Sequence, residues 1–69
     1  MISEKIKIVL VKRDKSKAWL AEQLGCTSSN LYAKLRRDNF SEKEVKEICE
    51  ILDCDLEINL VLRDSKEKF

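Results

Sequence analysis

Histidine and proline are both absent from this chain of 69 residues, and glycine occurs once. Without histidine the chain lacks the most common general base of nucleophilic catalysis, and with one glycine it cannot form a glycine-rich loop around a phosphate. An enzyme is therefore the weakest of the functional classes. The same scarcity leaves few residues that break helices, so we expect a helical fold.

Cysteine is scarce as well: the three cysteines stand at positions 26, 49 and 54, without CxxC spacing. A zinc site would need all three thiols and a carboxylate, so we expect no metal, no cofactor and free thiols in a reducing cytoplasm. Cys49 is interpreted as a buried structural thiol and Cys54 as a turn residue. No apolar run approaches the ~18 residues of a membrane span, so we expect no membrane partner.

Charged residues make up 39% of the chain, and their signs are unevenly divided. Residues 1–37 hold nine Lys/Arg and three acidic residues, which gives a net charge of +6. Residues 38–69 hold five Lys/Arg and ten acidic residues, which gives a net charge of −5. No acidic residue lies between Leu24 and Asp38. This asymmetry favours a surface that binds a polyanion, and ordinary solvated helix faces are the alternative.

Caps and apolar spacing predict four helices, at residues 2–13, 17–24, 28–37 and 42–52. Ser16 and Thr27 are N-caps, Ser41 begins a capping box, and Gly25 ends the second helix. The residues expected to face the core are Ile2, Ile6, Val9, Leu10, Leu20, Ala21, Leu24, Leu31, Leu35, Val45, Ile48, Cys49 and Leu52. Ile8 and Val11 fall outside this set, so we expect another element or a second subunit to cover them.

The second and third predicted helices, joined by a glycine turn, are typical of a helix-turn-helix. Winding residues 28–37 at about 100° per residue leaves a small, polar and basic face opposite Leu31 and Leu35. Its residues are Ser29, Ala33, Arg36 and Arg37, flanked by Ser28, Asn30, Tyr32 and Lys34. Such a face can enter the major groove, so double-stranded DNA is the predicted partner.

The apolar spacing becomes alternating near the end of the chain, at Leu56, Ile58, Leu60 and Leu62. This pattern predicts a half-buried strand, which cannot satisfy its own backbone. We expect it to pair with the same strand of a second subunit, antiparallel about a two-fold axis, in a homodimer. Pairing with residues 5–11 and a fifth short helix are the alternatives. Residues 1–55 then form the DNA-binding domain, and residues 56–69 the dimerisation strand with a frayed tail.

The chain resembles short stand-alone members of the Cro/CI-type (XRE) helix-turn-helix family of phage and bacterial transcriptional regulators. The matching residues are Leu20-Ala21, Leu24-Gly25, Thr27, Leu31 and the basic segment through Arg37. The resemblance implies an all-α, four-helix domain like that of lambda repressor, here with the short C-terminal strand. It also implies an operator-binding transcription factor that is often a dimer on a palindrome.

The resemblance, together with the exposed face, gives the expected DNA contacts. The base-reading candidates are Ser28, Ser29, Asn30, Tyr32 and Ala33, and the phosphate-contact candidates are Lys17, Lys34, Arg36, Arg37 and Asn39, with Lys12 or Arg13 as further candidates. Trp19 replaces a glutamate common in the family and is interpreted as a packing residue. Because Ser29 and Ala33 are short, we expect specificity to rest on Tyr32, Asn30, methyl contacts and DNA shape.

These features predict a sequence-specific regulator, most simply a repressor, that binds a palindromic operator as a homodimer. The alternative from another class is a protein-interaction module, antitoxin-like or anti-repressor, that keeps the fold without specific DNA binding. The short Ala33 and the low net charge of +1 favour this alternative. The absence of acidic residues from positions 25–37 argues against it.

Overall fold

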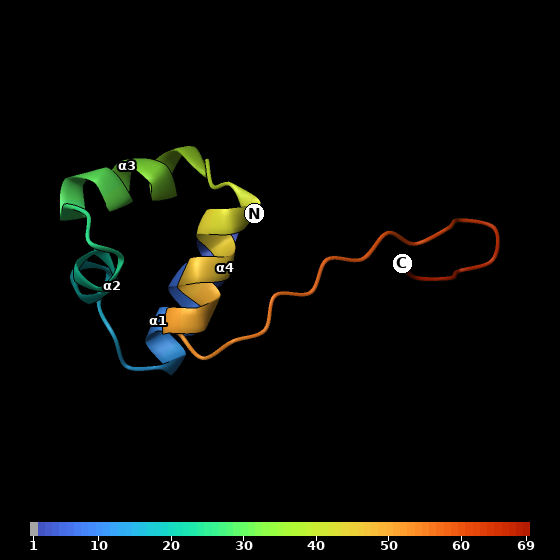
Figure 1. The fold of residues 1–69 in the computed structure, drawn as a ribbon, viewed down its shortest axis with the longest axis horizontal. Coiled ribbons are helices and arrows are strands. Elements are labelled where there is room, and N and C mark those ends of the chain that lie inside the picture. The colour runs from blue at the N-terminus through green and yellow to red at the C-terminus, as the bar shows by residue number, and fades with distance from the viewer. Residues whose placement is uncertain (1) are drawn as a thin grey trace.

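The computed structural model describes residues 2–69, which form four helices and a C-terminal segment that projects from them (Figure 1). The helices are α1 (Ile2–Lys12), α2 (Lys17–Leu24), α3 (Ser28–Arg37) and α4 (Glu42–Ile51). The predicted all-α class is confirmed, and each helix lies within one residue of its expected bounds. We call residues 55–69 the arm. Because the arm projects, the Cα radius of gyration is 13.9 Å, against about 11 Å for a compact chain of this length.

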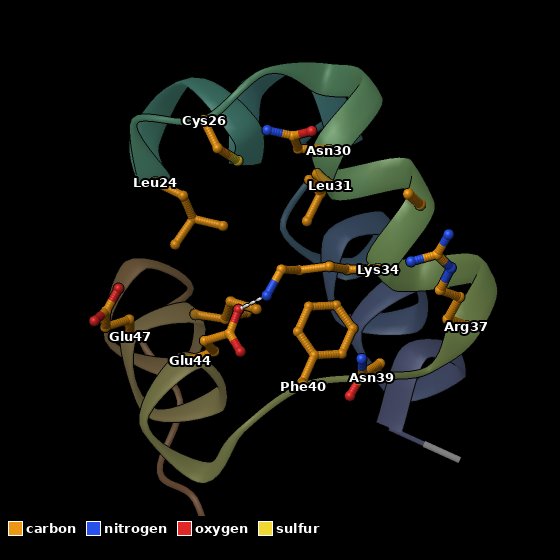
Figure 2. A pocket seen from close by; sticks show the side chains of 12 residues that line it. Leu24, Cys26, Asn30, Leu31, Lys34, Arg37, Asn39, Phe40, Glu44 and Glu47 are labelled. Carbon is orange, nitrogen blue, oxygen red and sulfur yellow. Dashed lines mark hydrogen bonds and ion pairs between the residues drawn. The ribbon is translucent and has the colours of Figure 1, made fainter.

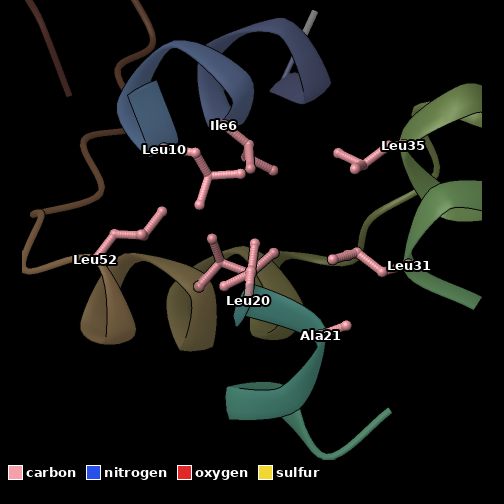
Figure 3. Close-up of a cluster of buried hydrophobic side chains, with 8 residues drawn as sticks. Ile6, Leu10, Leu20, Ala21, Leu31, Leu35 and Leu52 are labelled. Carbon is pink, nitrogen blue, oxygen red and sulfur yellow. The ribbon is translucent and has the colours of Figure 1, made fainter. Parts of the chain in front are cut away.

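The core lies where the four helices meet. Its largest fully buried side chains are Leu20, Leu31 and Ile48, one each from α2, α3 and α4. Ile6, Leu10, Ala21, Leu35 and Leu52 complete the cluster (Figure 3). Burying one such leucine or isoleucine contributes roughly 1.5–3 kcal/mol. Ala21 is 1% exposed, and because its side chain is small, α2 and α3 can approach each other closely.

Each helix is followed by a residue with positive φ: Asp14 at 57°, Gly25 at 73°, Asp38 at 55° and Asp53 at 57°. Backbone bonds from the next residue then turn back into the helix: Lys15 N to Leu10 O at 2.9 Å, Cys26 N to Ala21 O at 3.0 Å, Asn39 N to Lys34 O at 3.2 Å and Cys54 N to Cys49 O at 2.8 Å. This is the Schellman motif, which satisfies carbonyls that a helix end leaves unpaired. Glycine is the usual residue at this position of the motif, but three of the four helices of this chain have aspartate there. Aspartate tolerates the left-handed conformation better than most residues do.

Two polar contacts join α1 to remote parts of the chain. The N–H of Ser3 donates to Asp38 Oδ1 at 2.8 Å, so the residue that ends α3 also caps α1. Hydrogen bonding from Ser3 lowers the pKa of Asp38. At the other end of α1, Arg13 donates from Nε to Leu52 O and from Nη2 to Asp53 O, each at 2.9 Å. Arg13 therefore holds the C-terminus of α4, and its role as a phosphate contact stays a prediction.

The arm is extended at residues 56–60 and folds back on itself at its end (Figure 1). Leu60 and Phe69 exchange two backbone hydrogen bonds of 2.8 Å, Leu62 N donates to Glu67 O at 2.9 Å, and Val61 and Lys68 form an isolated antiparallel bridge. Residues 67–69, which belong to the tail expected to fray, thus pair with residues 60–62. Neither a fifth helix nor pairing with residues 5–11 occurs in the described part of the chain. Pairing of residues 56–62 between subunits stays a prediction.

Across residues 2–69, no helix combines the length and the apolar character that crossing a bilayer requires.

We expect Asp14→Gly to raise the free energy of unfolding by about 0.5–1 kcal/mol, because glycine adopts positive φ without strain and the aspartate charge opposes the negative end of α1. Urea unfolding followed by circular dichroism measures the change. Asp14→Asn is the matched control: it removes only the charge, so it should give part of the gain. A less stable glycine variant would show that the Asp14 side chain contributes more than the backbone strain costs.

Candidate nucleic-acid interface

Packing determines which face of α3 meets solvent. Thr27 Oγ1 accepts the N–H of Asn30 at 3.2 Å and so fixes the start of the helix. Leu31 and Leu35 are buried against the core, which turns the opposite face outward. On that side Ser29, Asn30, Tyr32, Arg36 and Arg37 are exposed, whereas Ser28, Ala33 and Lys34 are half-buried. All five base-reading candidates therefore reach the surface of α3, two of them with partly covered side chains.

Spacings of three and four residues divide this surface into two rows. The first row, Ser29, Tyr32 and Arg36, lies on the outer side of α3. The second row consists of Asn30, Ala33, Lys34 and Arg37, which line a hollow of about 380 Å³ between α3 and α4 together with Asn39 (Figure 2). Leu24, Leu31, Phe40 and Ile48 give this hollow an apolar floor. Of the basic residues on α3, Lys34 therefore lies beside the hollow, and Arg36 and Arg37 lie at the C-terminal end of the helix.

A contact between α2 and α3 brings two of the candidates together. Lys17 is the first residue of α2, and its Nζ lies 5.8 Å from the ring centroid of Tyr32 on α3. Such cation–π contacts contribute about 0.5–1 kcal/mol at exposed sites. The contact places a candidate phosphate contact beside a candidate base contact.

Lys34 lies in a different environment from the other basic candidates. Its Nζ forms an ion pair with Glu44 Oε2 on α4 (Figure 2). Glu44 also accepts the N–H of Ser41 at 3.0 Å, and Ser41 Oγ accepts the N–H of Glu44 at 3.1 Å, which completes the expected capping box. Lys34, followed by the Ser41 N–H, lowers the pKa of Glu44 to about 2. Glu44 thus offsets the Lys34 charge, so Arg36 and Arg37 are the stronger candidates for phosphate contacts.

Trp19 and the cysteines complete the surroundings of α3. Trp19 is half-buried against the core, and Lys15 Nζ lies 5.0 Å above its ring. This location fits the packing role expected for Trp19. Cys26, in the turn before α3, is exposed, and the thiols of Cys49 and Cys54 are also free. Residues 2–69 contain no group of three Cys, Asp or Glu side chains that could hold a metal ion.

A short second helix, a left-handed glycine turn and a capped third helix with a basic outer face are the parts of a DNA-binding helix-turn-helix. A model of the Cro/C1-type HTH DNA-binding domain matches residues 5–57. The chain belongs to the Cro/C1-type HTH family. Searches among curated proteins and among solved structures give no match.

Membership of the Cro/C1-type family makes this chain a DNA-binding protein, and the family is not one of enzymes. Within the matched residues, α2 and α3 are the two helices of the helix-turn-helix motif. The match ends at residue 57, so most of the arm lies beyond the Cro/C1-type domain.

The Glu44 carboxylate should make stability depend on pH in the acid range. Because its pKa is lowered from 4.5 to about 2 in the folded protein, the stabilisation is present above pH 4.5 and is lost as the pH falls toward 2. In Glu44→Gln this part of the acid destabilisation should disappear, while the amide keeps the capping box. Urea unfolding between pH 2 and pH 6 measures it. Parallel pH profiles for the two proteins would contradict the role given to the Lys34 ion pair.

Proposed function

We propose that this Cro/C1-type protein is a sequence-specific transcriptional repressor that binds a palindromic operator as a homodimer. The observation that carries the proposal is the exposed face of α3, where Ser29, Tyr32, Arg36 and Arg37 meet solvent and no acidic residue intervenes. The three free thiols suit the reducing cytoplasm, where we expect the protein to act.

The contacts divide into two kinds. Arg36, Arg37 and Lys17 bind phosphates and supply most of the affinity, because neutralising phosphates releases condensed counterions. Asn39, at the edge of the same surface, adds a neutral phosphate contact. Lys34 contributes once DNA draws its ammonium group away from Glu44.

Base recognition involves the first turns of α3. Ser28, Ser29 and Asn30 offer short polar groups to base edges, and Ala33 can pack against a thymine methyl group. Tyr32 is the largest side chain on this face, and it is 40% exposed. Of these residues only Asn30 has a carboxamide that can form a bidentate contact, with adenine, so DNA shape supplies part of the specificity.

The arm supports the homodimer because it exposes apolar side chains in an extended segment. Ile58 is 60% exposed, Leu60 73% and Leu62 46%, and Leu56 is half-buried. On α1, Ile8 and Val11 are 55% and 79% exposed. These exposed apolar side chains on the arm and on α1 are candidates for burial against a second copy. A second copy, with the apolar face of the paired arms over Ile8 and Val11, would cover them.

The hydrogen bonds of the arm indicate which edge is free to pair. Leu60 and Leu62 donate to Phe69 and Glu67 of the same arm. Since successive backbone groups of a strand point to opposite sides, the groups of Asn59 and Val61 point to the other edge. We therefore propose that two arms pair through this edge, antiparallel about a two-fold axis, and thereby set the two α3 helices in successive major grooves about 34 Å apart.

Arg36→Ala tests the DNA-binding surface. It should weaken binding to every duplex and reduce the slope of log K against log salt by about 1, because one phosphate contact is lost. Anisotropy titrations at several salt concentrations measure the slope. Arg63→Ala, which removes the same charge from the arm, should leave the slope unchanged.

A change in base preference without a change in slope would contradict the phosphate role of Arg36. Absence of binding by the unaltered protein even at low salt would instead favour the protein-interaction module.

Leu60→Glu tests the dimer. Because each dimer buries two copies of this side chain, its loss should cost about 3 kcal/mol and raise the dimer dissociation constant roughly a hundredfold. Sedimentation equilibrium measures it. Asp64→Lys, an equally polar change in the turn of the arm, should leave the dissociation constant unchanged. Equal association of the two variants would show that the arm is not the dimer contact.

A further inference from the structure

The end of α4 places two cysteines at the positions that a Schellman motif brings together. The N–H of Cys54 donates to Cys49 O at 2.8 Å, and the N–H of Asp53 donates to Glu50 O at 3.3 Å. Asp53 has the positive φ, 57°, that the motif requires. The side chains at the positions of Cys49 and Cys54 often make an apolar contact in this motif. In this chain both of them carry a thiol.

The hydrogen bond limits how far apart the two cysteines can be. With 2.8 Å between the Cys54 nitrogen and the Cys49 oxygen, standard bond lengths keep the two Cα atoms less than about 6.7 Å apart. Disulfides usually join Cα atoms about 4.4–6.8 Å apart. The Cys54 side chain is also turned back toward the helix end, because its Sγ donates to Leu52 O at 3.4 Å and it packs against the core.

Both cysteines are half-buried. Burial raises the pKa of Cys49, and the charges of Cys54 and Asp55 raise it further. An influence of one thiol on the other is expected only when they are near each other. The raised pKa makes the Cys49 thiolate harder to form, so we assign the first attack on the reagent to Cys54.

We propose that Cys49 and Cys54 are a modification site, at which a small-molecule disulfide such as glutathione disulfide converts the two thiols into an intrachain disulfide. The Cys54 thiolate attacks one sulfur of the reagent, and the first glutathione thiolate leaves. Cys49 then gives its proton to solvent and attacks the Cys54 sulfur, and the second glutathione thiolate leaves. The chain gives up two protons and two electrons, and the electrons reduce one glutathione disulfide to two glutathione thiols.

The disulfide joins the last turn of α4 to the residue that precedes the arm. It holds Asp53 in its left-handed conformation and fixes the direction in which the arm leaves the helices. None of the candidate DNA contacts on α2 and α3 lies in the closed loop. The site therefore depends neither on DNA binding nor on the homodimer.

The full chain with Cys26→Ser, which keeps only this pair of thiols, tests the proposal. The protein is equilibrated in mixtures of reduced and oxidised glutathione, alkylated with iodoacetamide and weighed by mass spectrometry. As the mixture becomes more oxidising, we expect a loss of both alkylation sites and a monomer lighter by two hydrogen atoms. Adding Cys49→Ser or Cys54→Ser should leave one thiol, which forms only a glutathione adduct.

The same equilibration in urea shows whether the folded structure promotes formation of the disulfide between Cys49 and Cys54. Native protein should be more oxidised than unfolded protein in the same glutathione mixture, because the motif holds the thiols together. Equal oxidation in the two states would overturn the proposal. So would a product in which both thiols carry glutathione, or one in which the new bond joins two chains.

Discussion

The burial of Leu20 is the constraint on which the other features depend. This side chain has no exposed surface, and the helix that carries it, α2, contacts both α3 and α4. A helix of eight residues is too short to be stable alone, so tertiary packing must hold it. Replacing Leu20 by a smaller residue would therefore remove the support of α3 as well as a contact in the core.

The direction of α3 follows from that packing. Leu31 and Leu35 are buried on the side of the core, and the residues a half-turn away then meet solvent. The left-handed turn at Gly25 and the cap at Thr27 determine where α3 begins. The ion pair between Lys34 and Glu44 joins the middle of α3 to α4. The orientation of the α3 surface that we propose for DNA recognition therefore follows from the packing of the core.

Local features of the fold could be predicted from the sequence, because caps and apolar spacing act within one or two helical turns. Ser16, Thr27 and Ser41 each cap the helix expected of them. Contacts between distant residues could not: Ser3 and Asp38 are 35 positions apart, and Arg13 and Leu52 are 39 apart. No local pattern distinguishes a basic residue that caps a helix from one that binds phosphate.

The same limit explains the site and the arm. Helical winding predicted an exposed face of Ser29, Ala33, Arg36 and Arg37; in the structure three of these residues are exposed and Ala33 is half-buried. Winding could not predict that Lys34 contacts Glu44 or that Lys17 lies over Tyr32. The alternation of residues 56–62 predicted a half-buried strand; the structure has an extended segment there that is mostly exposed, and the strand stays a prediction. Its return through residues 63–69 depends on backbone bonds that polar, charged side chains do not reveal.

Binding to DNA of defined sequence tests the central claim most directly. Fluorescence anisotropy compares a duplex from upstream of the coding sequence with a scrambled duplex, each at low and at physiological salt. The account predicts tighter binding to the upstream duplex that persists at physiological salt. Equal affinities for the two duplexes, lost together as salt rises, would contradict sequence-specific recognition by α3.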